Sequence, residues 1–242
     1  GRIASLKLLP LSYTELENEG RIEENIEEIM FKGGYPRLFN DDIEPIHFFP
    51  HYIETYLQRD VRLLKNIENQ ISFVRFIKLC AGRIASILDL SSLARDANIA
   101  VNTAKSWLSI LEASYIVYFV QPYSGNVNRR MIKSPKLYFY DTGLACSLLN
   151  IEYAKQLNTF YLRGNLFENF VLSELLKSRY NRGLPPNFYF LRDSKGMEID
   201  CITEKPEGMQ LVEIKLSETL TREHIKNIIG GFKSQMQLLV KQ

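Results

Sequence analysis

The sequence has few of the features that mark secreted or membrane proteins. Only 3 of its 242 residues are cysteine, and Cys80, Cys146 and Cys201 form neither a CxxC pair nor a metal-binding spacing, which indicates a reduced environment. No apolar run approaches the roughly 18–20 residues that a membrane-spanning helix needs, and the first residues do not have the pattern of a signal peptide. We therefore expect a cytoplasmic protein without a membrane partner.

Two further absences concern nucleotide binding and the start of the chain. The glycine-rich phosphate-binding loop that ends in Gly-Lys-Ser/Thr does not occur, so we expect these residues alone neither to bind nor to hydrolyse ATP. The chain opens with Gly1-Arg2-Ile3 rather than with Met. From this opening we expect a fragment or a processed form of a longer protein.

The overall composition is that of an ordinary soluble protein. Hydrophobic residues make up 45% and charged residues 24%, which is typical of one or two globular domains at this length. Acidic side chains outnumber basic ones by 13 to 8 over residues 1–68, whereas basic ones lead by 22 to 15 over residues 69–242. The mildly basic C-terminal part is compatible with a nucleic-acid partner but does not require one.

Residues 1–68 read as a helical segment interrupted by loops. We expect a short strand over residues 6–11 that Pro10 ends, a helix over residues 22–31 that Gly33-Gly34 stops, breaks at Pro45 and Pro50, and a helix over residues 48–64. Arg59 and Asp60 lie on that last helix, either on a solvated face or against a partner domain.

Residues 69–141 have a different organisation. The apolar spacing predicts helices over residues 71–81, 89–97 and 101–113, followed by paired strands over residues 115–120 and 136–140. The loop between the strands is basic. Three helices followed by such a hairpin are typical of a winged helix-turn-helix.

The winged helix would contact DNA through its third helix and its basic loop. Lys105 lies on that helix, and Arg129, Arg130 and Lys133 lie in the loop, where arginine and lysine could bind phosphate. The alternative is a winged helix that serves as a packing or protein-interaction spacer. Just after the hairpin, Asp141 or Thr142 is placed to cap a helix that runs to Leu149.

A long helix is predicted from Gly164 to about Tyr180. Its expected buried stripe consists of Phe167, Phe170, Val171 and Leu175, with Glu168 at the edge of the stripe. Glu174 falls near the centre of the stripe, so we expect it to be paired or functional. Strands are then expected over residues 188–191, 196–203 and 210–216, a helix over residues 221–229, and an apolar helix from there to the end.

The last two of these strands carry a constellation of charged residues. Asp200 lies on the first, and Glu213 and Lys215 share one face of the second because strand side chains alternate. Two carboxylates on neighbouring strands, with a lysine beside one of them, can bind a hard divalent cation and act on a phosphate. The alternative is an exposed strand pair with ordinary surface charges.

Together with Glu168 on the preceding helix, Asp200 and Glu213-x-Lys215 resemble the core of PD-(D/E)xK nucleases. The resemblance implies that Asp200 and Glu213 bind Mg²⁺ (or Mn²⁺ as a substitute), that Glu168 assists, and that Lys215 positions the attacking water or stabilises charge. Arg192 would contact the scissile phosphate. The proline of the motif name is absent, since Ile199 precedes Asp200.

A wider set of motifs resembles the C-terminal part of a group of bacterial and archaeal AAA+-type ATPases. In these proteins an ATPase domain precedes a winged helix and a nuclease-like domain of unknown function. The resemblance implies that an ATP-binding domain belongs before Gly1. It rests on Leu9-Pro10-Leu11-Ser12-Tyr13-x-Glu15, Gly33-Gly34-Tyr35-Pro36, Tyr56-Leu57-x-Arg59-Asp60, Pro135-Lys136-Leu137-Tyr138-Phe139-x-Asp141-Thr142-Gly143 and Phe167-Glu168-Asn169.

The sequence therefore predicts a multi-domain α and α/β protein in three parts. These are a helical segment over residues 1–68, a winged helix-turn-helix over residues 69–141 and a restriction-endonuclease-like α/β domain over residues 142–242. The expected function is Mg²⁺-dependent cleavage of DNA, with DNA and the upstream ATPase domain as partners. The alternative is a non-catalytic DNA- or protein-binding regulatory module. A homo-oligomer and a toxin-like or defence role are also compatible with the sequence.

Overall fold

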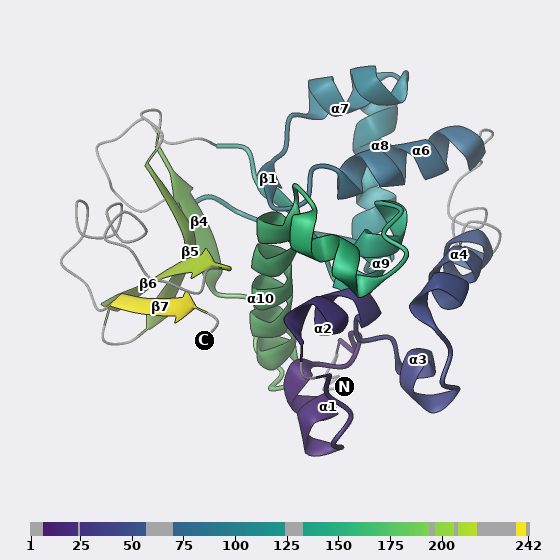
Figure 1. Cartoon of the computed structure of the whole chain (residues 1–242). Helices are drawn as coiled ribbons and strands as arrows, with labels where there is room; N and C mark the ends of the chain where they lie inside the picture. Colours follow the sequence, from purple (N-terminus) through teal and green to yellow (C-terminus); the bar gives the residue numbers. More distant parts are fainter. Residues whose placement is uncertain are drawn as a thin grey trace, which may run out of the picture.

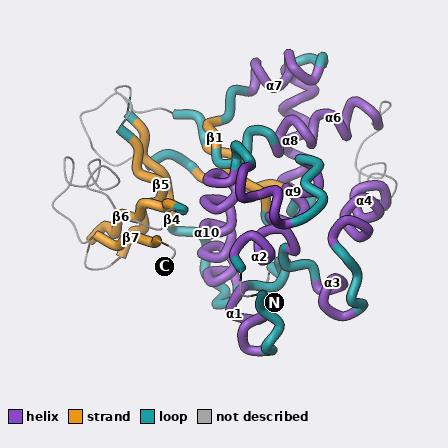
Figure 2. The backbone as a smooth tube through the Cα atoms, in the orientation of Figure 1, coloured by secondary structure: helices purple, strands orange, loops and turns teal. Residues whose placement is uncertain are grey.

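The structure is a computed structural model, and it describes residues 7–23, 25–56, 70–123, 133–193, 197–205 and 208–216, together with the backbone of residues 236–240. In this part of the chain the protein is mixed α/β, with helices and two small sheets. Figure 1 shows a largely helical body and a sheet beside it, and Figure 2 shows the strands gathered in two separate places. Among the described residues, no helix is both long and apolar enough to cross a membrane.

Short helices form the N-terminal part of the chain. The strand predicted over residues 6–11 is wrong for its described part, because residues 7–11 form a loop in which the Leu11 N–H donates to the Gly34 carbonyl at 2.7 Å. The helix predicted from residue 22 begins later because the Asn25 side chain accepts the N–H of Glu27 and caps it there. The helices are α1 (Tyr13–Asn18), α2 (Ile26–Lys32), α3 (Pro36–Asn40) and α4 (Pro45–Tyr56).

The break predicted at Pro45 coincides with the start of α4, whereas the break predicted at Pro50 is wrong. Pro45 is the first residue of the helix, where its missing N–H would be unpaired in any case. Pro50 lies inside the helix. Aromatic packing holds the helix there, since Tyr35 contacts the rings of Phe48 and Phe49 with centroid distances of 5.6 and 5.7 Å. The predicted continuation to residue 64, with Arg59 and Asp60, lies outside the described residues.

Two of the sequence motifs meet in the core. Asp141 caps a helix through the N–H of Leu144 at 2.9 Å, as predicted, and its other carboxylate oxygen accepts the N–H of Gly34 at 2.7 Å. A Cβ atom on Gly33 would clash with the Asp141 carboxylate, and Gly33 has a positive φ of 70°. The Gly33-Gly34 and Asp141-Thr142-Gly143 motifs are therefore packed against each other and hydrogen-bonded.

Helices and a three-stranded sheet form the middle of the chain. The sheet has the order β1-β3-β2, and its pairs are antiparallel. Trp107 packs edge-on against Phe73 and Phe76 at centroid distances of 5.1 and 5.3 Å, which joins the first and third helices. The elements are α6 (Gln70–Ala81), β1 (Ser86–Ile87), α7 (Leu90–Ala97), α8 (Val101–Ala113), β2 (Val117–Val120) and β3 (Lys136–Phe139).

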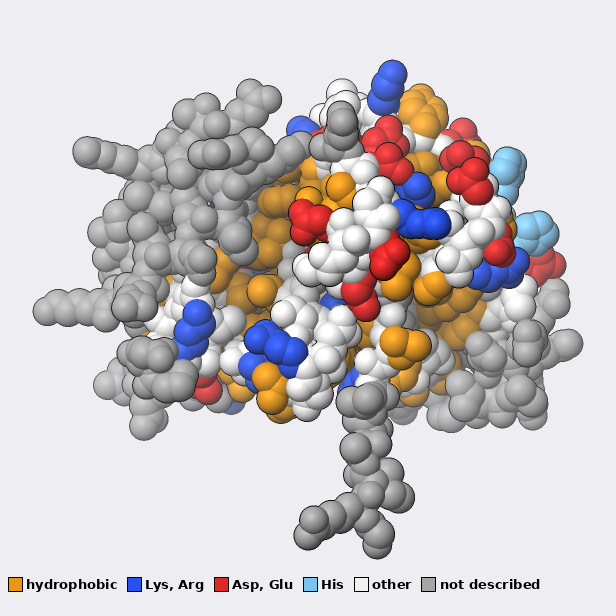
Figure 3. All heavy atoms as spheres, turned by 90° about the horizontal axis from the view of Figure 1, so that it is seen from below, with side chains coloured by type: hydrophobic (Ala, Val, Ile, Leu, Met, Phe, Trp, Pro, Cys, Tyr) orange, Lys and Arg blue, Asp and Glu red, His pale blue; other side chains and the backbone are white. Residues whose placement is uncertain are grey.

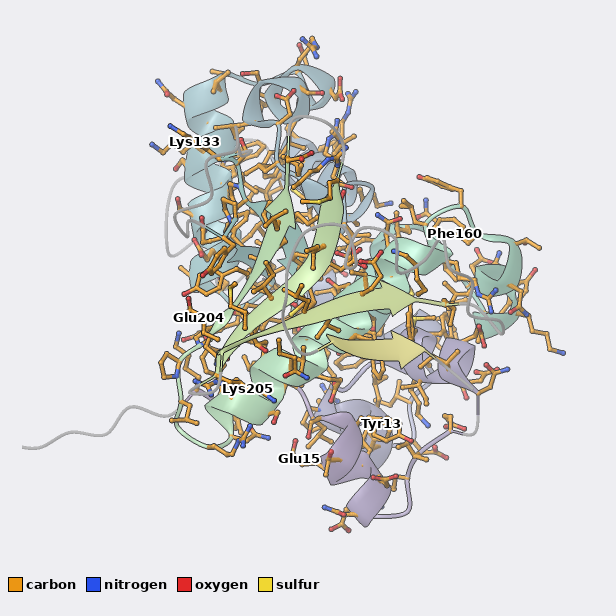
Figure 4. The ribbon with its side chains drawn as sticks, turned by 90° about the vertical axis from the view of Figure 1, so that its left-hand side faces the viewer. Tyr13, Glu15, Lys133, Phe160, Glu204 and Lys205 are labelled. Carbon is orange, nitrogen blue, oxygen red and sulfur yellow. The ribbon has the colours of Figure 1, made fainter. Side chains whose placement is uncertain are left out.

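A long helix and a four-stranded sheet follow. Helix α10 lies between the sheet and the helical body and contacts β6 on one side and β3, α9 and α2 on the others (Figure 1). The sheet faces the viewer in Figure 4, where Glu204 and Lys205 mark the tip of the β5–β6 hairpin. The elements are α9 (Thr142–Leu148), the 3-10 helix η2 (Ala154–Thr159), α10 (Arg163–Tyr180), β4 (Phe188–Arg192), β5 (Glu198–Lys205), β6 (Gly208–Lys215) and β7 (Met236–Val240).

The last strand corrects the prediction of a helix at the C-terminus. Residues 236–240 form β7, which pairs in parallel with β6, whereas β4, β5 and β6 pair antiparallel. A short apolar run cannot be assigned to helix or strand by periodicity alone, and here an open sheet edge is available for pairing. The helix predicted over residues 221–229 lies outside the described residues.

The buried stripe predicted for α10 is also wrong in part. Phe167 is buried as expected, but Phe170, Val171 and Leu175 are only half-buried. The buried face instead includes Asn169, whose side-chain amide bonds both the N–H and the carbonyl of Phe139. Buried polar residues with such partners shift the face away from the one that apolar residues alone indicate.

Glu174 is paired, as its position on α10 predicts. Its carboxylate lies 2.8 Å from Lys177 Nζ and accepts the N–H of Tyr13 at 2.7 Å. Lys177 also donates to the Leu11 carbonyl. This pair ties the N-terminal segment to α10 and has a structural role.

Candidate active site

The charged residues predicted on the sheet and on α10 line one pocket of about 470 Å³. Five separate elements supply its charged residues. Helix α10 supplies Glu168, strands β4, β5 and β6 supply the residues predicted from the sequence, and β3 supplies a lysine. The charged lining residues are Lys136, Glu168, Arg192, Glu198, Asp200, Glu213 and Lys215.

Asp200 is fixed at the point where β5 and β6 separate. The described pairing of the two strands ends at Cys201 and Val212. Beyond it the Asp200 carboxylate accepts the backbone N–H of Ile214 at 2.9 Å, which takes the place of the next rung of the ladder. Asp200 is 4% exposed. A buried carboxylate held in this way has a defined orientation toward the pocket.

Glu213 is a buried acid with one satisfied oxygen. Its Oε1 atom lies 2.9 Å from Lys215 Nζ, whereas Oε2 is buried and has no hydrogen-bond partner among the described residues. Burial, together with the nearby charge of Asp200, raises the pKa of Glu213 to about 7. A proton or a bound cation would therefore stabilise this carboxylate.

Lys215 joins the two acids. Its Nζ atom lies 3.2 Å from Asp200 and 2.9 Å from Glu213, and its side chain is 37% exposed. Burial alone would lower the pKa of Lys215, but the two carboxylates raise it above its ordinary value. The ammonium group is thus charged and open to solvent on one side.

Glu168 belongs to a second group of charged residues that lines the same pocket. Its Oε1 atom accepts hydrogen bonds from Lys136 Nζ at 2.9 Å and from the Tyr138 hydroxyl at 2.6 Å. Burial raises the pKa of Glu168 to about 7, although Lys136 opposes the shift. Lys136 also lies 2.6 Å from Glu198, which in turn lies 3.2 Å from Arg192.

The sequence patterns do not indicate Lys136 and Glu198 as residues of the site. Both stand in predicted strands, and the partners of Lys136 on α10 and β5 are far away in the chain. The available signal was a lysine in an otherwise apolar strand, two residues before Tyr138. Strand periodicity places both side chains on the same face, which here is the face toward Glu168.

Of the predicted nucleic-acid contacts, Arg192 lines the pocket, whereas the predicted contacts on α8 and before β3 do not. Within the described part of the chain, Lys105 on α8 and Lys133 before β3 are exposed and do not line the pocket. Arg129 and Arg130 lie outside the described residues. Figure 3 shows acidic and basic side chains interspersed on the face seen from below.

The donor set of the pocket fits a magnesium ion only in part. Among the described residues, no three His, Cys, Asp or Glu side chains are grouped to hold a metal. Mg²⁺, however, is usually held by one or two carboxylates with water or substrate phosphate as its other ligands. Asp200 and Glu213 provide such a pair, and the buried Glu213 Oε2 is the atom that a cation would satisfy.

Comparison with curated proteins finds relatives of unknown function. Uncharacterized proteins of Mycobacterium bovis and Mycobacterium tuberculosis are each 26% identical over 217 residues, which is 87% of this chain and 47% of theirs. The chain thus spans about half the length of these relatives. No solved structure matches significantly.

Two family models match consecutive parts of the chain. Residues 163–241 match a domain of unknown function, DUF4143, which is found at the C-terminus of AAA-type ATPase-associated proteins. Residues 23–155, more than half of the chain, match another domain of unknown function, DUF8612. The chain therefore belongs to the DUF8612 family.

Proposed function

We propose that this chain is the C-terminal part of an AAA-type ATPase-associated protein and that its pocket hydrolyses phosphodiester bonds of DNA with Mg²⁺. The proposal rests on the pair of buried carboxylates, Asp200 and Glu213, with Lys215 Nζ within 3.2 Å of both. The pairing of β4, β5 and β6 beside α10 supports a PD-(D/E)xK-like fold for residues 163–241.

Each residue of the pocket would have a distinct role in hydrolysis. When bound, Mg²⁺ would polarise the phosphate and lower the pKa of a water ligand. Asp200 and Glu213 would hold it. Lys215, which is partly exposed, would orient the attacking water, and Glu168 on α10 would support the site. Arg192 is 41% exposed and could bind a phosphate oxygen while it remains near Glu198.

DNA is the substrate that the middle of the chain favours. The order α6, β1, α7, α8, β2, β3 with the sheet order β1-β3-β2 supports a winged helix-turn-helix. Asn102, Lys105 and Ser109 are exposed on one face of α8, where a major-groove contact would lie. Arg129 and Arg130, which lie outside the described residues, and Lys133 are proposed phosphate contacts.

A non-catalytic regulatory module is the second candidate. The observation that favours it is that Lys215 already bonds one oxygen of each carboxylate. A site of this kind could persist as a charged scaffold for DNA or protein binding. Activity is therefore the property that separates the two candidates.

The test is a cleavage assay with Mg²⁺ or Mn²⁺ on branched, single-stranded and double-stranded DNA. Both the whole natural protein and this chain should be assayed. We expect metal-dependent cleavage that Asp200→Asn and Glu213→Gln abolish, whereas Glu204→Gln, an exposed change at the tip of the same hairpin, leaves it intact. Cleavage that survives both site variants, or no cleavage of any substrate by the whole protein, would favour the regulatory module.

A further inference from the structure

Lys136 is a buried cation placed between two carboxylates. Its side chain is 2% exposed, and its Nζ atom lies 2.9 Å from Glu168 and 2.6 Å from Glu198. The ring of Phe190 lies beneath the ammonium group, with its centroid at 5.5 Å. Lysine is almost never this buried unless it is paired, so the position is specified by its partners.

The pocket thus contains two carboxylate pairs, each with its own lysine. Lys215 forms ion pairs with Asp200 and Glu213, and Lys136 forms ion pairs with Glu168 and Glu198. The two lysines differ in their freedom to leave, since Lys215 is 37% exposed and Lys136 is 2% exposed. Lys215 can therefore move from between its two carboxylates and make room for a cation while it still lines the pocket, whereas Lys136 would have to leave a buried position.

We propose that Lys136 is a positioning residue that acts as a resident cation and limits the pocket to one divalent ion, at Asp200 and Glu213. The assignment of that ion rests on the proposed function. Lys136 occupies the position in which Glu168 and Glu198 would otherwise hold a second ion, and it fixes both side chains. The hydroxyl of Tyr138, also on β3, bonds Glu168 from the same face and completes this arrangement.

The pocket is consequently shared by the two family segments. Strand β3, with Lys136 and Tyr138, lies in the segment at residues 23–155, whereas Glu168, Asp200 and Glu213 lie in the segment at residues 163–241. The second segment alone has four carboxylates but lacks the buried cation that balances two of them. A complete site therefore requires both segments.

Counting bound Mn²⁺ by electron paramagnetic resonance on the whole 242-residue chain tests the proposal. Lys136→Met frees Glu168 and Glu198, so we expect it to bind one ion more than the unmodified chain. Lys136→Arg keeps the cation and should leave the count unchanged. The double variant Lys136→Met/Glu168→Gln removes one of the freed ligands and should return the count to that of the unmodified chain. An equal count in Lys136→Met and the unmodified chain would overturn the proposal.

A second variant does not depend on the folding of Lys136→Met. Glu198 is only partly buried, and Glu198→Gln leaves Lys136 paired with Glu168. We expect the count and affinity of Mn²⁺ to stay unchanged. A loss of the roughly 10–100-fold typical when a group that supports a metal is removed would instead place Glu198 at the metal and overturn the proposal.

The outcome for Lys136 is separable from the outcome for the proposed function. Absence of bound Mn²⁺ from the unmodified chain would count against the Asp200 and Glu213 metal site. The difference of one ion between Lys136→Met and the unmodified chain would still report on Lys136 alone.

Discussion

At the scale of single residues, the pocket is defined by carboxylates that the fold keeps away from water. Glu168 and Glu213 both have pKa values raised to about 7, primarily because they are buried. Perturbed acids gathered in one pocket are typical of functional sites, although structural ion pairs also perturb pKa values. Because these pKa values differ between the folded and unfolded chain, the free energy of unfolding should depend on pH.

Glu168 should make stability depend on pH. Its folded-state pKa of about 7 lies above the ordinary 4.5, so the folded protein holds the proton more tightly than the unfolded chain does. Protonated Glu168 therefore stabilises the folded state. This contribution to the free energy of unfolding is complete below about pH 4.5 and is lost as pH rises through about 7, a change on the order of 3 kcal/mol. The free energy of unfolding of the unmodified chain minus that of Glu168→Gln, from urea denaturation, should fall over this range. A difference that does not change with pH would contradict this account.

We expect that a side chain at Gly33 destabilises the protein, whereas a side chain at Gly164 does not. Gly33 has φ 70° and ψ −162°, a region that is essentially restricted to glycine, and an added Cβ would meet Asp141. Gly33→Ala should therefore lower the free energy of unfolding by about 1–3 kcal/mol from backbone strain, with a further loss from the clash. Gly164→Ala, in α10 with open space around it, is the matched control and should be neutral or stabilising by up to about 1 kcal/mol. Equal effects of the two changes would contradict the close packing of Gly33 against Asp141.

At the scale of secondary-structure elements, local sequence signals predicted some elements closely and others not. Helix α8 has the predicted bounds, residues 101–113, and Asp141 caps α9 as predicted. Strand β7 and the helical state around Pro50 were mispredicted because distant parts of the chain decide them: an open edge beside β6 and the aromatic rings around Tyr35. Local capping and periodicity carry no information about such partners.

The same distinction applies to the pocket. The alternation of strand residues predicted that Glu213 and Lys215 share a face, and they do meet at 2.9 Å. Lys136 gave no comparable signal because its partners, Glu168 and Glu198, are 32 and 62 positions away in the chain. Sequence patterns thus located the acids, whereas the packing of β3 against α10 was needed to find the cation between them.

Helix α8 offers a test of DNA binding at this scale. Lys105 is exposed on the face that would enter a groove. If it contacts a phosphate, Lys105→Ala should weaken binding to all sequences and reduce the slope of log K against log salt concentration by about 1. Fluorescence anisotropy titrations at several salt concentrations measure this slope. Lys155→Ala, an exposed change on η2, is the control. An unchanged slope in Lys105→Ala would favour the alternative in which the proposed winged helix is only a packing or protein-interaction spacer.

At the scale of the whole molecule, α10 and β3 make the two family segments interdependent. One hydrophobic core extends from Leu9 through the helices to Ile214 on β6. The segment just after β2 also bonds to β4, since the Tyr123 N–H donates to the Phe190 carbonyl at 2.7 Å. The site and the core therefore cross the boundary between the two segments.

Residues 163–241 should consequently fold poorly alone. Without the preceding segment, α10 would lose its contacts with β3, α9 and α2, and Leu176, which is buried beside Tyr118 and Tyr140, would become exposed. Burying such a side chain contributes about 1.5–3 kcal/mol, a large part of a small domain's stability. We expect the isolated segment to lack a cooperative thermal transition by circular dichroism, whereas the 242-residue chain has one. A cooperative transition in the isolated segment would show that the segments are independent.

The central claim is that Asp200 and Glu213 form a divalent cation site. A crystal of the chain soaked in Mn²⁺ tests it most directly, because anomalous scattering locates the ion. We predict one anomalous peak in contact with both carboxylates, with Lys215 displaced from between them, and no peak at this position in Glu213→Gln. Lys215 still bonded to both carboxylates at saturating Mn²⁺, with no peak beside them, would contradict the claim.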